Sequence, residues 1–123
     1  MIKFYYNTAP NPTKVALCLE EMGLPYELVP VDTRKGEQHT PSFLAINPNA
    51  KVPAIVDDGV TVFDSNAILL YLAEKTGKFL PGTSLATRAS VPLRMVYDRR
   101  STLSRALYAG TQVLFCSAMT LGA

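Results

Sequence analysis

Two short motifs of this 123-residue chain have the residue types needed to hold a small extended anion. Pro53 opens a β-rich run, and a proline, which cannot donate to a sheet ladder, belongs at the first position or the edge of a strand. Val52 can then turn its own N–H and C=O toward an extended partner. Asp64 and Ser65 stand where an apolar helix begins, and the unpaired N–H groups and the dipole of a helix start favour a carboxylate. Together the motifs predict a binding site for a small anionic peptide.

The two motifs, in this order, resemble those of the N-terminal, thioredoxin-like domain of glutathione S-transferases. That domain has a Val-Pro step before its third strand and an acidic-Ser step at a helix start. The likeness runs from Ile2 to about Gly82. Within the family the chain is most similar to bacterial members with Asn-Gly-His-Lys after the first strand, where this sequence reads Asn11-Pro12-Thr13-Lys14.

The resemblance implies a role for each motif in binding glutathione. In the family the valine backbone pairs with the cysteine part of glutathione, the proline is usually cis, and the acidic-Ser pair takes the γ-glutamyl end. We expect these roles for Val52, Pro53, Asp64 and Ser65.

Each candidate binding residue also has a purely structural interpretation. Asp64-Ser65 alone is an ordinary helix N-cap, and Pro53 alone is an edge-strand proline. The resemblance assigns Gln38 and Lys51 to the glycine carboxylate of glutathione, through an amide donor and an ammonium. Both are equally compatible with a solvated loop. The combination of the Val-Pro and Asp-Ser steps favours ligand binding.

Glutathione chemistry near neutral pH needs a thiolate, and a free thiol is mostly protonated. The protein must therefore lower the thiol pKa with hydrogen-bond donors or a helix dipole. Donors are expected between the first strand and the first helix, at Tyr5, Tyr6, Thr8 or Asn11. By the bacterial-type resemblance, Asn11 and Thr8 are the candidate catalytic residues, with Asn11 first. The alternative is that Asn11 only caps the helix and that the tyrosines pack the sheet.

Composition narrows the class of protein. Hydrophobic residues make up 48% of the chain, which suits a globular domain, and a net charge of +2 without an aromatic-basic stripe argues against nucleic-acid binding. The longest apolar stretch, 113–123, is too short and too polar to span a bilayer, and no signal segment opens the chain. We therefore expect no membrane contact and a cytoplasmic setting.

The two cysteines, Cys18 and Cys116, form no Cys-x-x-Cys pair, so neither a metal site nor an intrinsic dithiol centre is expected. We expect Cys18 in the core, and a disulfide between the two is disfavoured in reducing cytosol. The only histidine, His39, has no partner motif and is interpreted as an exposed loop residue.

Turn and cap signals predict an α/β domain with the element order β-α-β-α-β-β-α and a mixed four-stranded sheet with helices on both faces. The expected elements are a strand over Ile2 to Tyr6, a helix capped by Asn11 and ended by Gly23, an edge strand over Tyr26 to Val31, a short helix from Thr40-Pro41 to about Ile46, a hairpin of Ala54 to Asp57 and Val60 to Phe63 closed by Asp58-Gly59, and a helix from Ser65 to Thr76 closed by Gly77.

The composition changes after Gly82, where five of the six arginines but none of the lysines or glutamates follow. We therefore expect a thioredoxin-like, glutathione-binding domain at 1–82 and an atypical, irregular or helical tail at 83–123. A continuing transferase would have an all-helical second domain, and from Val91 onward this pattern is not matched. Met95-Val96 must be encoded ATG-GTN, so a one-nucleotide shift creates a tryptophan codon. A frameshifted tail and a genuine variable extension both remain open.

The resemblance implies glutathione binding with glutathione-dependent transfer, either conjugation of the thiolate to a small electrophile or disulfide reduction. One alternative is a noncatalytic, transferase-like binding module. Another is an incomplete gene product that lacks the electrophile pocket, because the helical second domain largely builds that pocket in relatives. Family members usually pair through both domains, so a homodimer is an expected partner.

Overall fold

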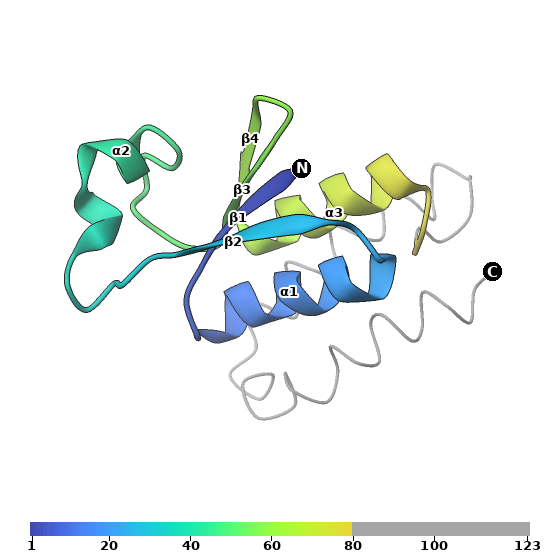
Figure 1. Cartoon of the computed structure of the whole chain (residues 1–123), viewed down its shortest axis with the longest axis horizontal. Coiled ribbons are helices and arrows are strands. Elements are labelled where there is room, and N and C mark those ends of the chain that lie inside the picture. Colours follow the sequence, from blue (N-terminus) through green and yellow to red (C-terminus); the bar gives the residue numbers. More distant parts are fainter. Residues whose placement is uncertain (80–123) are drawn as a thin grey trace. The chain divides into compact units, whose positions relative to one another are not determined.

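The computed structural model describes residues 1–79, and the chain divides into two compact units, Met1–Leu72 and Ala73–Ala123. The elements of the described part follow the predicted order (Figure 1). They are β1 (Ile2–Tyr6), α1 (Pro10–Met22), β2 (Tyr26–Pro30), a 3₁₀ turn η1 (Glu37–His39), α2 (Pro41–Leu44), β3 (Ala54–Asp57), β4 (Val60–Phe63) and α3 (Ser65–Thr76).

The four strands form one mixed sheet in the order β2-β1-β3-β4. β1 runs parallel to β2 and antiparallel to β3, and β3 and β4 form an antiparallel hairpin. The mixed sheet predicted from the sequence is confirmed, and so is the edge position of β2. That position suits a strand ending in Pro30, because proline cannot donate to a ladder.

Helices cover both faces of the sheet. Successive side chains of a strand point to opposite faces. Tyr5 of β1 contacts Phe43 of α2 edge to face, with ring centroids 5.9 Å apart, whereas its neighbour Phe4 is fully buried on the other face. Figure 1 shows α1 and α3 together on one side of the sheet and α2 on the other. The core between the sheet and the two longer helices includes Phe4, Val15, Leu19, Ile55 and Ile68, each fully buried.

Local turn chemistry explains where these elements end. Asp58 and Gly59 both have positive φ, 48° and 82°, which matches the twist of a two-residue hairpin. Gly23 adopts the left-handed conformation after α1, and its N–H bonds to carbonyls of the last turn. Thr40 caps α2 by accepting a hydrogen bond from the Phe43 N–H. These caps were predicted correctly, although α2 ends at Leu44 rather than near Ile46.

The predicted start of the first helix is wrong by two residues. α1 begins at Pro10, and Ala9, not Asn11, is the N-cap residue, with no side-chain cap. The N–H of Thr13 donates to the Ala9 carbonyl over 3.2 Å, which closes the first turn. Pro10 and Pro12 both fit this turn because its N–H groups have no partner within the helix. Asn11 is therefore an exposed residue of the first turn and not its cap.

The register of the strands brings four chain segments to the same end of the sheet. Tyr6 pairs with Pro30, Tyr5 pairs with Ala54, and Ala54 pairs with Phe63. The segments beyond these pairs are 7–9 after β1, 31–38 after β2, 47–53 before β3 and 64–65 after β4, and we call them the loop end of the sheet. Every candidate binding residue and Thr8 belong to it, and Asn11 lies in the helical turn that follows 7–9.

Cys18 is 4% exposed, as expected for a core position. Within residues 1–79, no helix is long and apolar enough to cross a membrane. The tail at 83–123, with Cys116 and the Met95-Val96 step, lies outside the described residues. The domain boundary at 82 and the two interpretations of the tail therefore stay predictions.

Candidate functional site

The Val52-Pro53 step forms the entrance to β3. Its peptide bond is cis, Pro53 is buried, and Val52 is half-buried at the end of the sheet. Ala50, shortly before it, has a φ of 54°, a conformation that residues other than glycine seldom adopt. This segment is thus a tightly shaped bend that leads directly into the sheet.

Asn47 holds that bend in place. It is 2% exposed, its Nδ2 donates to the Lys51 carbonyl over 2.7 Å, and its Oδ1 accepts from the Asn49 N–H over 3.0 Å. A buried amide with both ends paired strongly constrains the backbone around it. Asn47 therefore positions the residues just before Val52. Lys51 itself has an exposed side chain.

Asp64 caps α3 from a left-handed backbone conformation. Its φ is 74°, and its Oδ1 accepts from the N–H groups of Asn66 at 2.9 Å and Ala67 at 3.4 Å. The capping role proposed as a structural interpretation is therefore shown. Non-glycine residues held in this conformation are concentrated at functional sites, because the surrounding structure must compensate the strain. Ser65, the first residue of α3, is 6% exposed.

The Val-Pro and Asp-Ser motifs lie side by side. Ala54 and Phe63 are paired residues of the hairpin, so Pro53 and Asp64, one step beyond each, face each other at the loop end. Consecutive strands of a sheet are about 4.8 Å apart, a distance that a tripeptide easily spans. The backbone edge at Val52 and the amino end of α3 are therefore neighbours.

The segment between β1 and α1 reaches the same end. Asn7 organises it, because its Oδ1 accepts from the Ala9 N–H at 3.0 Å and its Nδ2 donates to Thr33 Oγ1 at 3.1 Å. Thr8 is exposed between these contacts, and Asn11 is exposed in the first turn of α1. Tyr6 stacks on Phe4, and Tyr5 contacts Phe43 as described above, so both tyrosines pack within the domain.

Thr33 also links this loop to Gln38. Gln38 Nε2 donates to the Thr33 carbonyl over 3.3 Å. The Gln38 Oε1 atom is buried, and none of residues 1–79 donates a hydrogen bond to it. The side chain thus has one end anchored at the loop end of the sheet and one end with unused capacity.

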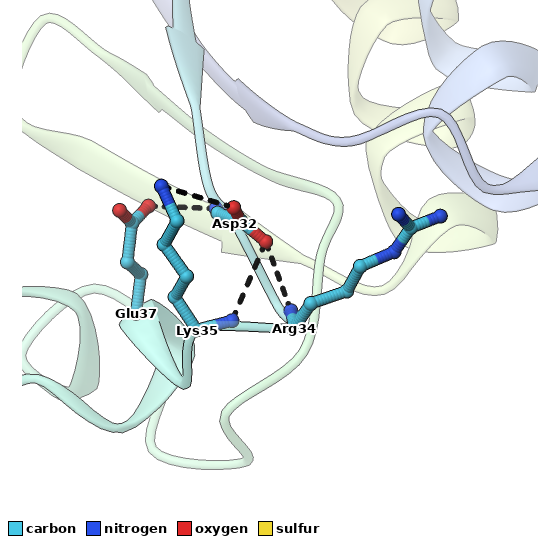
Figure 2. A network of polar contacts seen from close by, with 4 residues as sticks. All are labelled: Asp32, Arg34, Lys35 and Glu37. Carbon is cyan, nitrogen blue, oxygen red and sulfur yellow. Dashed lines mark hydrogen bonds and ion pairs between the residues drawn. The ribbon is translucent and has the colours of Figure 1, made fainter.

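A cluster around Asp32 shapes the start of the 31–38 segment. Its Oδ1 accepts from the N–H groups of Arg34 and Lys35, and its own N–H donates to Glu37 Oε2 (Figure 2). Lys35 Nζ lies 3.6 Å from Asp32 Oδ2, whereas the Arg34 guanidinium points away. The Arg34 N–H contributes most to holding the pKa of Asp32 below its usual 3.8. These contacts keep the Asp32 carboxylate ionised and stabilise the turn at 32–37.

Sequence reasoning missed four polar residues whose side chains link or order the segments around the site, namely Asn7, Lys14, Asn47 and Asn66. Lys14 is 9% exposed and donates from Nζ to Asn66 Oδ1 over 2.7 Å, joining α1 to the first turn of α3. All four are common polar residues, and only Asn47, beside Pro48, stands in a recognisable turn signal. The partners that Asn7, Lys14 and Asn66 contact through their side chains lie 26 or 52 positions away, so no local pattern identifies these three.

The arrangement brings the Val52 backbone, the amino end of α3 with the Asp64 carboxylate, and the exposed polar side chains of Thr8 and Asn11 to one end of the sheet. It offers an anion and an extended backbone complementary partners on adjacent elements. Among the described residues, no group of three or more His, Cys, Asp or Glu side chains is arranged to hold a metal ion.

Comparison with known proteins places this geometry in a family. Residues 8–75 match the model of the glutathione S-transferase N-terminal domain. The chain is 54% identical over 87 residues to the disulfide-bond oxidoreductase YfcG of Escherichia coli, covering 65% of this chain and 40% of that protein. It is 43% identical over 75 residues to the transcriptional regulator URE2 of Saccharomyces cerevisiae, covering 58% of this chain and 21% of that one.

Solved structures agree in fold. A glutathione transferase from Burkholderia graminis, with two glutathione molecules bound per subunit, is 39% identical with a TM-score of 0.72. The match covers 80% of this chain and 43% of that one. The chain thus spans less than half the length of the relatives that it matches, and it shares their thioredoxin-like fold. These findings show that the chain belongs to the glutathione S-transferase family and contains its N-terminal domain.

Proposed function

We propose that the domain at 1–82 binds glutathione at the loop end of its sheet and serves a glutathione-dependent transfer reaction. In this proposal the Val52 backbone pairs with the cysteine part, and Asp64 and Ser65 hold the γ-glutamyl end. Gln38 and Lys51 approach the glycine carboxylate. Family membership supports the ligand class, since the Burkholderia relative carries glutathione.

One observation carries the proposal. The pairing of Ala54 with Phe63 makes Val52-Pro53 and Asp64-Ser65 adjacent, although they flank different strands of the hairpin and lie 11 positions or more apart in sequence. A tripeptide with an extended backbone and a charged end needs this combination of backbone polar groups just before a strand and a helix start. Either motif alone is accounted for by fold stability, and their juxtaposition favours a common ligand.

The remaining site residues complete the proposal. Asn11 and Thr8 are exposed beside the amino end of α1, where a donor and the helix dipole both stabilise a thiolate. Gln38 reaches the same end with a buried amide oxygen that has no donor among residues 1–79. The Gln38 amide nitrogen carries two N–H groups, one of which donates to the Thr33 carbonyl, and the other is the kind of donor that a carboxylate requires.

The proposed chemistry is attack by the glutathione sulfur, with two outcomes left open. In conjugation, the thiolate forms a carbon–sulfur bond with an electrophilic carbon, and the leaving group departs with the bonding electrons. In disulfide reduction, the thiolate attacks one sulfur of a disulfide and releases a thiolate. A second glutathione then resolves the mixed disulfide to glutathione disulfide. The name of the Escherichia coli relative, a disulfide-bond oxidoreductase, favours the second outcome.

Calorimetric titration with glutathione tests the proposed site. Asp64→Asn keeps an oxygen that caps α3 but removes the charge, so we expect a loss of affinity of about 1–3 kcal/mol for one charge-assisted hydrogen bond. Asp58→Asn is the matched control, because Asp58 also has a positive φ but lies at the opposite end of the hairpin. Equal affinities for both variants and the unchanged chain would contradict the role of Asp64.

A second candidate function is a noncatalytic module that binds glutathione or a protein partner. It is favoured by the similarity to a Saccharomyces cerevisiae protein whose name is that of a transcriptional regulator. Assays with chlorodinitrobenzene and with bis(hydroxyethyl) disulfide separate the two candidates. Turnover of either compound above the rate with glutathione alone supports an enzyme. Tight glutathione binding without turnover of either supports the module.

A further inference from the structure

We infer that Lys14 is a positioning residue of the proposed glutathione site, acting through Asn66 on the first turn of α3. This inference rests on the proposed function and adds a residue to it. Lys14 lies in α1 and Asn66 in α3. Its Nζ donates to Asn66 Oδ1 over 2.7 Å, across 52 positions of sequence.

The burial of Lys14 sets it apart from the other core residues of α1. Lys14 is only 9% exposed, whereas other core positions of α1, such as Val15 and Leu19, carry apolar side chains. Taking an ammonium out of water is costly, and well-packed hydrophobic residues are often at least as stabilising as buried charges.

The acceptor occupies a position that controls the helix start. The Asn66 N–H donates to Asp64 Oδ1 over 2.9 Å, so one residue joins Lys14 to the capping carboxylate. The Ile68 N–H bonds to the Asp64 carbonyl over 2.9 Å and closes the first turn. Holding the Asn66 side chain from α1 therefore restrains the first turn of α3 and, through the Asn66 N–H, the Asp64 carboxylate that is proposed to hold the γ-glutamyl end.

The hydrogen bonds from Lys14 to Asn66 and from Asn66 to Asp64 thus connect two elements of the site. The amino end of α1 carries the proposed thiol-activating residues, and the amino end of α3 carries the proposed γ-glutamyl contacts. A hydrogen bond between α1 and α3 sets the separation of the two, and small errors in such positioning reduce binding strongly. This explains why a buried lysine, with a long reach and a charged donor, occupies the second turn of α1.

The experiment compares Lys14→Met, Lys14→Arg, Asn66→Ala and the double variant Lys14→Met/Asn66→Ala in the full chain. Lys3→Met, at an exposed lysine of β1, is the matched control. Affinity is measured for glutathione and for cysteinylglycine, which lacks the γ-glutamyl end.

We expect Lys14→Met to raise the Kd for glutathione about tenfold, the effect of one lost charged hydrogen bond. The Kd for cysteinylglycine should change little, and Lys14→Arg should restore most of the glutathione affinity. Asn66→Ala should match Lys14→Met, and the double variant should be no worse than either single variant. Equal losses for both ligands, or additive losses in the double variant, would overturn the inference.

Amide hydrogen exchange measured without ligand tests the positioning role independently of glutathione binding. Lys14→Met should speed exchange of the Ala67 and Ile68 N–H groups in the first turn of α3, while Lys3→Met should not. If the unchanged chain binds no glutathione, the proposed function fails and this measurement alone decides the positioning role. Unchanged exchange in both Lys14→Met and Asn66→Ala would overturn it. Asn66→Ala keeps the test valid should Lys14→Met not fold.

Discussion

Asn7 and Thr33, 26 positions apart, are joined by a hydrogen bond of 3.1 Å from the Asn7 amide to the Thr33 hydroxyl. The bond ties the β1–α1 loop to the loop after β2. Because Thr33 also accepts from Gln38 through its carbonyl, the same pair connects the proposed thiol-activating segment with a proposed carboxylate contact. The loop end of the sheet is therefore cross-braced by side chains as well as ordered by strand pairing.

Breaking this brace should be measurable as a coupled loss of stability. We expect Asn7→Ala to lower the free energy of unfolding by about 1 kcal/mol, because it removes a partly buried hydrogen bond. A double-mutant cycle with Thr33→Val, followed by urea denaturation, isolates the pair. The predicted coupling energy is on the order of 1 kcal/mol. Strictly additive effects of the two substitutions would show that the pair contributes nothing.

Asn47→Ala should destabilise the domain and weaken ligand binding together. The substitution removes two hydrogen bonds at a buried position and leaves the Lys51 carbonyl without its described donor, at a cost of about 1–3 kcal/mol in unfolding free energy. Because the bend before Val52 then relaxes, the Kd for glutathione should rise as well. Asn49→Ala, at an exposed position, is the control. A stable Asn47→Ala variant with unchanged affinity would contradict the positioning role.

Asn11→Ala should separate thiol activation from helix capping. Since Asn11 is exposed and does not cap α1, its removal should leave stability unchanged or slightly raised, because alanine is the better helix former. Ultraviolet absorbance of the thiolate, followed against pH, should show a higher pKa for bound glutathione, with affinity largely retained. An unaltered thiol pKa would contradict the role of Asn11 in thiol activation. Thr8 would then be the next candidate, and Thr8→Val is the corresponding test.

The Asp32 cluster should add stability with a defined pH dependence. Hydrogen bonds from the N–H groups of Arg34 and Lys35 hold the pKa of Asp32 below 3.8 in the folded state. A lowered folded-state pKa contributes stability above the unfolded-state value, and this is lost as the pH falls through the folded-state pKa. The unchanged chain should thus be more stable than Asp32→Asn at neutral pH, and it should lose this advantage as the pH falls below 3.8. Denaturation at a series of pH values measures it. A difference independent of pH would contradict the assignment.

The sequence predicted the elements that local chemistry determines. Asp58-Gly59 predicts a tight hairpin, Gly23 predicts a helix end and Thr40-Pro41 predicts a helix start. Each of these predictions succeeds because the signal depends only on neighbouring residues. The start of α1 was wrong because Pro10 and Pro12 both fit a first turn. The Ala9 N–H is held by the Asn7 side chain, which is oriented by Thr33. A local pattern cannot resolve a choice that a distant residue makes.

The candidate site follows the same division. The Val52-Pro53 and Asp64-Ser65 steps could be recognised from their order and spacing, and the strand register then brings them together. Lys14 could not be recognised, because a lysine in the second turn of an amphipathic helix is usually solvated. Its hydrogen bond to Asn66 forms only when α1 and α3 pack on the same face of the sheet.

Amide NMR spectra recorded during a glutathione titration test the central claim most directly. If one groove between the Val52 edge and the start of α3 holds the tripeptide, the signals of Val52 and of Ser65 and Asn66 should shift together, with one shared Kd. The Asp58 and Gly59 signals, at the far end of the hairpin, should stay in place. Shifts at only one of the two motifs, two different dissociation constants, or no shifts in the folded chain would contradict the account.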